Sequence, residues 1–203
     1  DTIVRQVEDI GRMVDEFSAF ARMPKPTKQR SDLREILTDA VFLREIGSAE
    51  IEFQRSFGDE PLEGSFDARM LAQAVGNIVK NAVEAIEAVP PEELGGKGKI
   101  LVRSSFDQEH DRFIVDVIDN GRGLPVENRH RILEPYMTMR EKGTGLGLAI
   151  VKKIIEEHGG QLELHDAPAD FDRGRGAMIR IILPRADAPA VVTESDKEKV
   201  HGL

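Results

Sequence analysis

Apolar side chains recur at spacings of three and four along the first 21 residues. The positions are Ile3, Val7, Ile10, Val14, Phe17 and Ala21. This spacing predicts a helix with one apolar seam, which packs either on other helices of a bundle or on its own domain. Met23-Pro24-Lys25-Pro26 ends the helix, because each proline removes a backbone donor and disfavours helix at the preceding residue. We therefore expect one helix over residues 1–23 and a linker over residues 24–30.

Helical and strand periods follow one another after the linker. Ser31 can cap a second helix, and Asp67 opens a long helix that runs to about Ala88. A third helix follows a glycine-rich segment at 143–147 and ends near His158. Alternating or short apolar runs predict strands over residues 51–57, 99–106, 112–118, 161–165 and 177–183.

This order of elements favours an α+β domain with an antiparallel or mixed sheet that carries its helices on one face. The domain should span residues 31–185, with a loop over residues 90–98, and one helix, either a bundle helix or a helix packed on the domain itself, should precede it. Beyond Pro184 the chain is polar and rich in Ala and Pro, which predicts a disordered tail over residues 186–203.

Composition narrows the classes of function. The chain has 203 residues, no Cys, and a net charge of -9 from 28 Lys plus Arg against 37 Asp plus Glu. An acidic chain is a poor general nucleic-acid binder, because such binding rests on neutralising phosphates. No apolar run approaches the roughly 20 residues that span a bilayer, so these residues are not expected to insert into a membrane. The chain starts at Asp1 inside a helical pattern, which suggests that it is cut from a longer protein.

Two amides lie four residues apart on the predicted long helix, so that Asn77 and Asn81 project from one face. Asn is a mediocre helix former, and its amide needs hydrogen-bond partners when it is buried. The pair consists either of solvent-facing amides or of a site where an amide oxygen ligates a hard cation such as Mg²⁺.

A carboxylate follows an apolar strand directly, in the segment Asp119-Asn120-Gly121-Arg122-Gly123. This segment is either an ordinary strand-ending turn or a site where Asp119 accepts a hydrogen bond from an amino group such as that of adenine. In the second case, Gly121 and Gly123 let a base lie against the backbone.

A glycine-rich loop, Gly143-Thr144-Gly145-Leu146-Gly147-Leu148, opens the third helix. It is either a flexible hinge or a site where free amides at a helix start bind phosphate oxygens. Its spacing matches neither the dinucleotide fingerprint nor the Walker motif. Before it, Glu134-Pro135-Tyr136 and the cations Arg140 and Lys142 form either a plain surface loop or a mobile lid over phosphates.

Taken in this order, the four segments resemble those of the catalytic and ATP-binding domain of sensor histidine kinases, in the superfamily that also holds gyrase, Hsp90 and MutL. The segment from Asn77 to Asn81 resembles the N box, Asp119 to Gly123 the G1 box, Glu134 to Tyr136 the F box and Gly143 to Leu148 the G2 box. The resemblance covers about residues 31–185 and implies a two-layer α/β sandwich, the Bergerat fold. The first helix resembles the second helix of the dimerisation and phosphotransfer hairpin, and is most similar to nitrogen-regulation kinases of the NtrY and NtrB type.

The resemblance also implies roles for individual residues. Asp119 would hold the adenine amino group, Asn81 would ligate Mg²⁺, and Asn77 would assist around the phosphates. The remaining contacts to ATP would come from Lys80, Gly121, Gly123, Tyr136, Arg140, Lys142, Gly143, Thr144, Gly145, Leu146, Gly147 and Leu148. Glu84 departs from the family pattern, which often has a basic residue there.

By the same resemblance, the chain is expected to be a protein-histidine kinase domain that binds ATP and Mg²⁺. ATP-hydrolysing relatives similar to gyrase carry a Glu at the position of Asn77, and Asn cannot take a proton from water. The histidines, none of which lies in a phosphoacceptor pattern, are His110, His130, His158, His165 and His201. The γ-phosphate should therefore pass to a His outside these residues, and then to an Asp of a response regulator. The alternative is a nucleotide-gated ATPase clamp or a non-catalytic ATP-binding interaction module of the same superfamily.

Partners and location also follow from the resemblance. It implies a homodimer in the full-length protein, a receiver domain of a response regulator as partner, and no nucleic-acid partner. It further implies a cytoplasmic domain of a parent protein at the inner membrane, with sensor segments upstream of residue 1.

Overall fold

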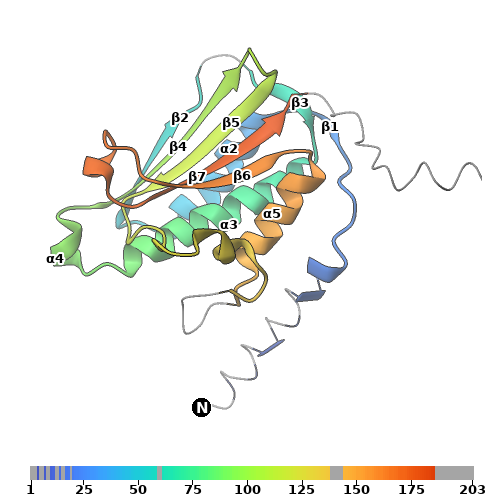
Figure 1. Cartoon of the computed structure of the whole chain (residues 1–203). Helices are drawn as coiled ribbons and strands as arrows, with labels where there is room; N and C mark the ends of the chain where they lie inside the picture. Colours follow the sequence, from blue (N-terminus) through green and yellow to red (C-terminus); the bar gives the residue numbers. More distant parts are fainter. Residues whose placement is uncertain are drawn as a thin grey trace, which may run out of the picture.

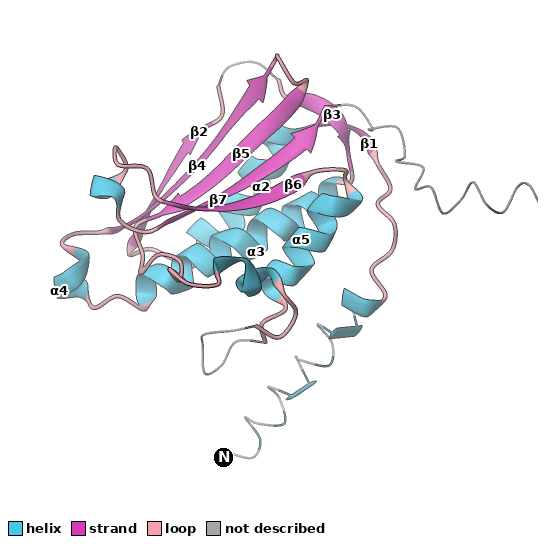
Figure 2. Cartoon of the chain, viewed as in Figure 1, coloured by secondary structure: helices cyan, strands magenta, loops and turns pink. Residues whose placement is uncertain are grey.

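The computed structural model describes residues 20–58, 61–137 and 144–185, together with residues 4, 7, 10, 11, 14, 17 and 18 of the N-terminal helix. Its domain has two layers, a five-stranded sheet and helices gathered on one face of that sheet (Figures 1 and 2). The strands, in order across the sheet, are β2 (Ile51–Ser56), β4 (Gly98–Asp107), β5 (Arg112–Asp119), β7 (Ala177–Pro184) and β6 (Gln161–Asp166). β2 runs parallel to β4 and the other neighbours are antiparallel, which confirms the predicted mixed sheet.

The helical layer consists of α2 (Leu33–Glu45), α3 (Ala68–Glu87) and α5 (Gly147–Glu157). α3 lies in the middle and packs against the other two helices (Figure 1). Asp67 caps α3, because its carboxylate accepts a hydrogen bond from the Met70 amide at 3.0 Å. The apolar stripe that predicted this helix is buried, and it consists of Leu71, Val75, Ile78, Val79, Ala82 and Ile86. This stripe belongs to the main core between helices and sheet.

The start of the domain differs from the prediction that Ser31 caps the second helix. Ser31 instead lies in β1 (Gln29–Asp32), which pairs antiparallel with β3 (Glu63–Phe66). Asp32 is the cap, and its carboxylate accepts hydrogen bonds from the amides of Arg34 at 2.9 Å and Leu62 at 3.0 Å. The Asp32 carboxylate therefore caps the start of α2 and also bonds α2 to the segment before β3. Ser31 is one residue too early to cap α2, because it lies within β1. A one-turn helix, α4 (Pro91–Leu94), also interrupts the predicted loop at 90–98.

The N-terminal helix touches the domain at its C-terminal end. Val7, Ile10 and Val14 of its apolar seam are between 56% and 63% exposed. By contrast, Phe20 and Met23 pack against the main core, and the Lys153 ammonium donates to the Phe20 carbonyl at 3.0 Å. This domain therefore covers only the last turns of the N-terminal helix, and the described seam residues before them are exposed. The expectation of a disordered tail over 186–203 lies outside the described residues.

Candidate functional site

The first two predicted segments meet at α3. Asn77 and Asn81 are half-buried, and Ala85 follows them on the same line of the helix, four residues further on. The Ala85 carbonyl accepts a hydrogen bond from the Arg122 amide at 3.2 Å. Gly121 packs so closely that a Cβ there would lie 2.6 Å from the Ala85 carbonyl carbon. The glycine segment after β5 is therefore fixed one helical turn from Asn81.

Asp119 lies at the end of β5, beside this contact, and is 6% exposed. Its carboxylate accepts a hydrogen bond from the Gly121 amide at 2.8 Å and another from the Ala177 amide. Burial nevertheless raises the pKa of Asp119 to about 6, because removing the charge from water outweighs those two donors. At neutral pH the group is mostly an anion with few protein donors, which suits it to accept a hydrogen bond from a ligand amino group.

The loop before β7 closes against Asp119 from the other side. Gly176 has a φ of 101°, and a Cβ there would lie 1.8 Å from the Asp119 carbonyl oxygen. Gly123 in turn lies against the Gly176 carbonyl. Only glycine fits at 176, so the end of β5 and the start of β7 interlock around the buried carboxylate.

The third and fourth predicted segments bind each other. The Tyr136 amide donates to the Gly145 carbonyl at 3.1 Å, which brings together the two ends of the segment between them. The Tyr136 side chain is 55% exposed, and its ring centroid lies 6.1 Å from that of Phe17 in the N-terminal helix. The predicted cations Arg140 and Lys142, and also Gly143, lie outside the described residues.

The glycine-rich loop leads directly into the start of α5, as predicted. The Thr144 hydroxyl accepts a hydrogen bond from the Leu146 amide at 3.4 Å, and Leu146 is buried. Leu146 is the N-cap residue and supplies no side-chain cap, while the space beside Gly147 is open. The first turn of α5, with Gly147 and the half-buried Leu148, therefore presents the positive end of a helix dipole.

The predicted metal ligand in this region is the Asn81 amide oxygen. Within the described ranges, no group of three or more His, Cys, Asp or Glu side chains is arranged to hold a metal. The half-buried Asn81 amide lies on the same helix face as the contact with the glycine segment. One protein oxygen beside a polyphosphate fits Mg²⁺, which keeps several waters and substrate oxygens as ligands. Lys80 is exposed and lies 3.9 Å from the Glu84 carboxylate.

Sequence reasoning missed Asn120, which is 1% exposed and bonds to two other segments of the chain. Next to a glycine it has the composition of an ordinary turn, so no local signal marks it.

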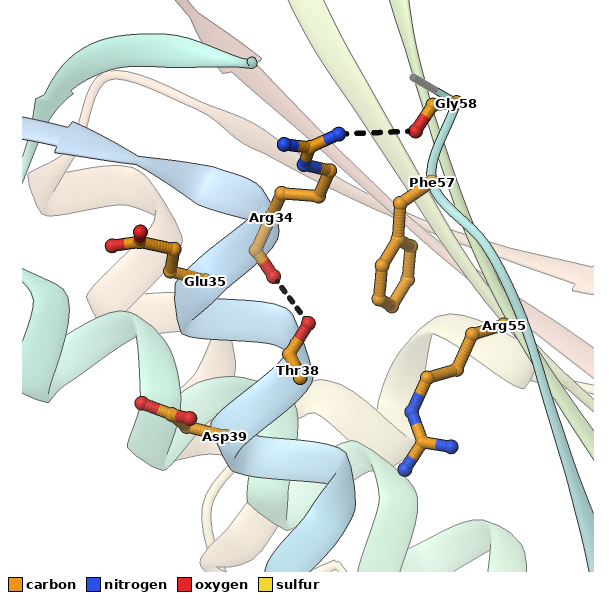
Figure 3. Close-up of a pocket in the computed structure, with 7 residues that line it drawn as sticks. All are labelled: Arg34, Glu35, Thr38, Asp39, Arg55, Phe57 and Gly58. Carbon is orange, nitrogen blue, oxygen red and sulfur yellow. Dashed lines mark hydrogen bonds between the residues drawn. The ribbon is translucent and has the colours of Figure 1, made fainter. Parts of the chain in front are cut away.

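A separate groove of about 630 Å³ lies between α2 and the end of β2 (Figure 3). It is lined by Arg34, Glu35, Thr38, Asp39, Arg55, Phe57 and Gly58. Asp119 pairs with Ile100 near the start of β4, whereas the last residue of β2, Ser56, pairs with Arg103 further along β4, so the chain after β2 runs away from Asp119. The groove is thus distinct from the site formed by the four segments.

A two-layer domain with this long central helix, strand-end carboxylate and glycine-started helix is of the class of nucleotide-binding ATPase domains. The sequence profile of the histidine kinase-, DNA gyrase B- and HSP90-like ATPases matches residues 66–187, and the chain belongs to that family. Among the residues that the structure describes, every helix is too short or too polar to span a bilayer.

The similar proteins include sensor kinases. The chain is 55% identical over 189 residues to nitrogen regulation protein NtrY of Azorhizobium caulinodans, covering 93% of this chain and 23% of that protein. Among solved structures, the mycobacterial sensor histidine kinase MprB is 28% identical, with a TM-score of 0.66, covering 80% of this chain and all of that one. Full-length ShkA in complex with AMPPNP is 26% identical, with a TM-score of 0.73, covering 93% of this chain and 39% of that one. The chain therefore spans about a quarter of the length of the NtrY protein that it matches.

Proposed function

We propose that the chain is the MgATP-binding catalytic domain of a two-component sensor kinase of the NtrY type. It transfers the γ-phosphate of ATP to a histidine outside these residues, for onward transfer to an aspartate of a receiver domain. The observation that carries the proposal is the buried Asp119 carboxylate, held beside the N-box helix by the contacts of Gly121 and Arg122 with Ala85. ShkA, which shares the fold, was solved with an ATP analogue.

Each segment has a part in binding the nucleotide. The Asp119 carboxylate accepts a hydrogen bond from the adenine amino group, and Gly121 and Gly123 leave room for the ring beside the backbone. The amides from Gly143 to Leu148, with the Thr144 hydroxyl, bind phosphate oxygens at the positive end of α5. Tyr136 anchors the lid, from which Arg140 and Lys142 reach the phosphates, and Lys80 lies on the exposed side of the same helix as Asn81.

Asn81 and Asn77 set the chemistry. When Mg²⁺ is bound, it supplies charge neutralisation on the phosphates, and Asn81 is its protein ligand. Asn77 orients groups around the phosphates but has no basic site that could take a proton from water. The domain is therefore suited to hold ATP for an incoming imidazole rather than to hydrolyse it.

The proposal places the phosphoacceptor histidine outside these residues, because none of the five histidines lies in a phosphoacceptor pattern. His158 is 3% exposed, and both its ring nitrogens are hydrogen-bonded. His110 and His165 lie against the carboxylates of Asp107 and Glu163, respectively. The exposed seam of the N-terminal helix would pack on a second copy in a homodimer of the full-length protein, which presents the acceptor. The domain would work in the cytoplasm, where its receiver-domain partner is found.

Calorimetric titration with a non-hydrolysable ATP analogue and Mg²⁺ tests this function. We expect saturable binding in the micromolar to millimolar range, lost in Asp119→Ala and Asn81→Ala. Incubation with γ-labelled ATP should leave no stable label on the chain alone. Absence of binding by the folded wild type, or stable labelling of the isolated chain, would contradict the proposal.

A further inference from the structure

We propose that Asn120 is a positioning residue for adenine recognition, acting on the Asp119 carboxylate together with Asp172 and Lys99. The proposal rests on the proposed function, because it assumes that Asp119 binds the adenine amino group. It assigns a role to a buried amide inside the second segment, next to Asp119, and to an ion pair that lies outside the four nucleotide-binding segments.

The Asn120 amide uses its oxygen and its nitrogen to tie three segments together. Its oxygen accepts a hydrogen bond from the Lys99 amide at 2.7 Å. Its nitrogen donates to the Lys97 carbonyl at 3.1 Å and to the Asp172 carboxylate at 3.1 Å. The side chain is almost completely buried, so water cannot replace these partners.

The ties to Lys97 and Lys99 fix the end of β5. In the pairing of β4 with β5, Asp119 lies opposite Ile100. The backbone amide of Asn120 donates to the Lys99 carbonyl at 3.2 Å. Its side chain adds the bonds to the Lys99 amide and the Lys97 carbonyl. The backbone is thereby held on the residue that follows Asp119, which limits how the carboxylate can shift.

The tie to Asp172 fixes the other wall. Asp172 lies in a short 3-10 turn, Asp172–Gly174, before β7, and its carboxylate also pairs with the Lys99 ammonium at 2.9 Å. Hydrogen bonds from Lys99 and Asn120 hold the pKa of Asp172 below its usual range, so the group is an anion at neutral pH. This turn leads to Gly176, which touches the Asp119 carbonyl, and to Ala177, whose amide donates to the Asp119 carboxylate.

An amide is the side chain that this position requires. The oxygen faces a backbone donor, while the nitrogen faces a carbonyl and a carboxylate, so one acceptor and two donors are needed. Asp at 120 would put a carboxylate against the Lys97 carbonyl and Asp172. Ala would leave the Lys99 amide and the Lys97 carbonyl without that partner.

The test compares two nucleotides that differ only in the 6-amino group, ATP and purine riboside triphosphate, each titrated with Mg²⁺. The wild type should bind ATP more tightly. In Asn120→Ala and Asp172→Ala, ATP affinity should fall about tenfold in the first and less in the second, while affinity for the purine nucleotide changes little. The ratio of the two dissociation constants therefore approaches one, which general destabilisation of the domain would not produce.

Asp107→Ala is the matched control. Asp107 is an ion-paired carboxylate at the other end of the same sheet, bonded to Arg112 at 2.8 Å, and its loss should leave the ratio unchanged. An unchanged ratio in both folded Asn120→Ala and Asp172→Ala, with or without an equal fall in both affinities, would overturn the proposal. Asp172→Ala keeps the test valid if Asn120→Ala does not fold. Asp119→Asn distinguishes failure of the proposed function from failure of the role of Asn120. If Asp119→Asn leaves the ratio unchanged, the proposed adenine contact itself is wrong.

Discussion

Exchanging the Asp119 carboxylate for the nearly isosteric amide in Asp119→Asn removes a buried charge from the unliganded domain. Burial raises the pKa of this carboxyl from 3.8 to about 6, so its ionisation opposes folding by about 3 kcal/mol. The folded-state pKa lies above the unfolded value, so the stability from this group is present below pH 3.8 and lost as the pH rises through about 6. At pH 8 the wild type carries the full penalty and the amide carries none.

Part of this gain is offset by hydrogen bonding. The carboxylate accepts hydrogen bonds from two backbone amides, those of Gly121 and Ala177. An Asn amide offers only one oxygen, and turning its nitrogen toward a backbone donor costs about 1–2 kcal/mol. The net expectation at pH 8 is that Asp119→Asn is more stable than the wild type by about 1–2 kcal/mol. On the proposed function, the same variant should bind ATP more weakly, because an Asn side chain has a donor as well as an acceptor where the carboxylate only accepts.

Urea unfolding followed by circular dichroism, at several pH values, measures this effect. The gain should shrink to about zero near pH 4.5, where the wild-type carboxyl is mostly neutral in the folded state. Asp107→Asn is the control with the opposite sign: the Arg112 hydrogen bond lowers the pKa of Asp107, so its stabilisation is present at neutral pH and lost in acid. If Asp119→Asn is less stable than the wild type at pH 8, or shifts stability equally at both pH values, the electrostatic reasoning is refuted.

Three further outcomes are expected. ATP affinity should fall as the pH drops through about 6, because protonated Asp119 no longer accepts the amino hydrogen bond; calorimetry between pH 5 and 8 checks this. Gly176→Ala should unfold the domain or strongly lower its melting temperature, whereas Gly76→Ala in α3, where a Cβ meets nothing within 4 Å, should gain about 0.5–1 kcal/mol in urea unfolding. His158→Ala should lose about 2–3 kcal/mol in the same assay, because the buried Asp67 amide loses its acceptor.

The sequence predicted most of the elements that carry a periodic apolar pattern. α3 has the expected cap and buried stripe, and the strands at β4 and β5 end within about one residue of their predicted limits. The pairing of β1 with β3 could not be predicted, because four-residue strands of largely polar sequence give no alternation to detect. Two hydrogen bonds flank this pairing: the Leu33 amide donates to the Leu62 carbonyl at 3.0 Å, and the Leu62 amide donates to the Asp32 carboxylate at 3.0 Å.

In the candidate site, too, some features follow from local sequence patterns and others depend on contacts between distant residues. Asn77 and Asn81 share a face by helix geometry alone, and the apolar strand before Asp119 indicates that its carboxylate is buried. The shape of the wall around that carboxylate depends instead on contacts between distant residues, such as Gly176 with Asp119 and Asp172 with Asn120. Contacts between distant residues leave no periodic pattern in the sequence. They nevertheless hold the Asp119 carboxylate where burial opposes its ionisation. On the proposed function, the adenine amino group donates to the ionised carboxylate, so nucleotide binding should stabilise the ionised domain and lower the pKa of Asp119.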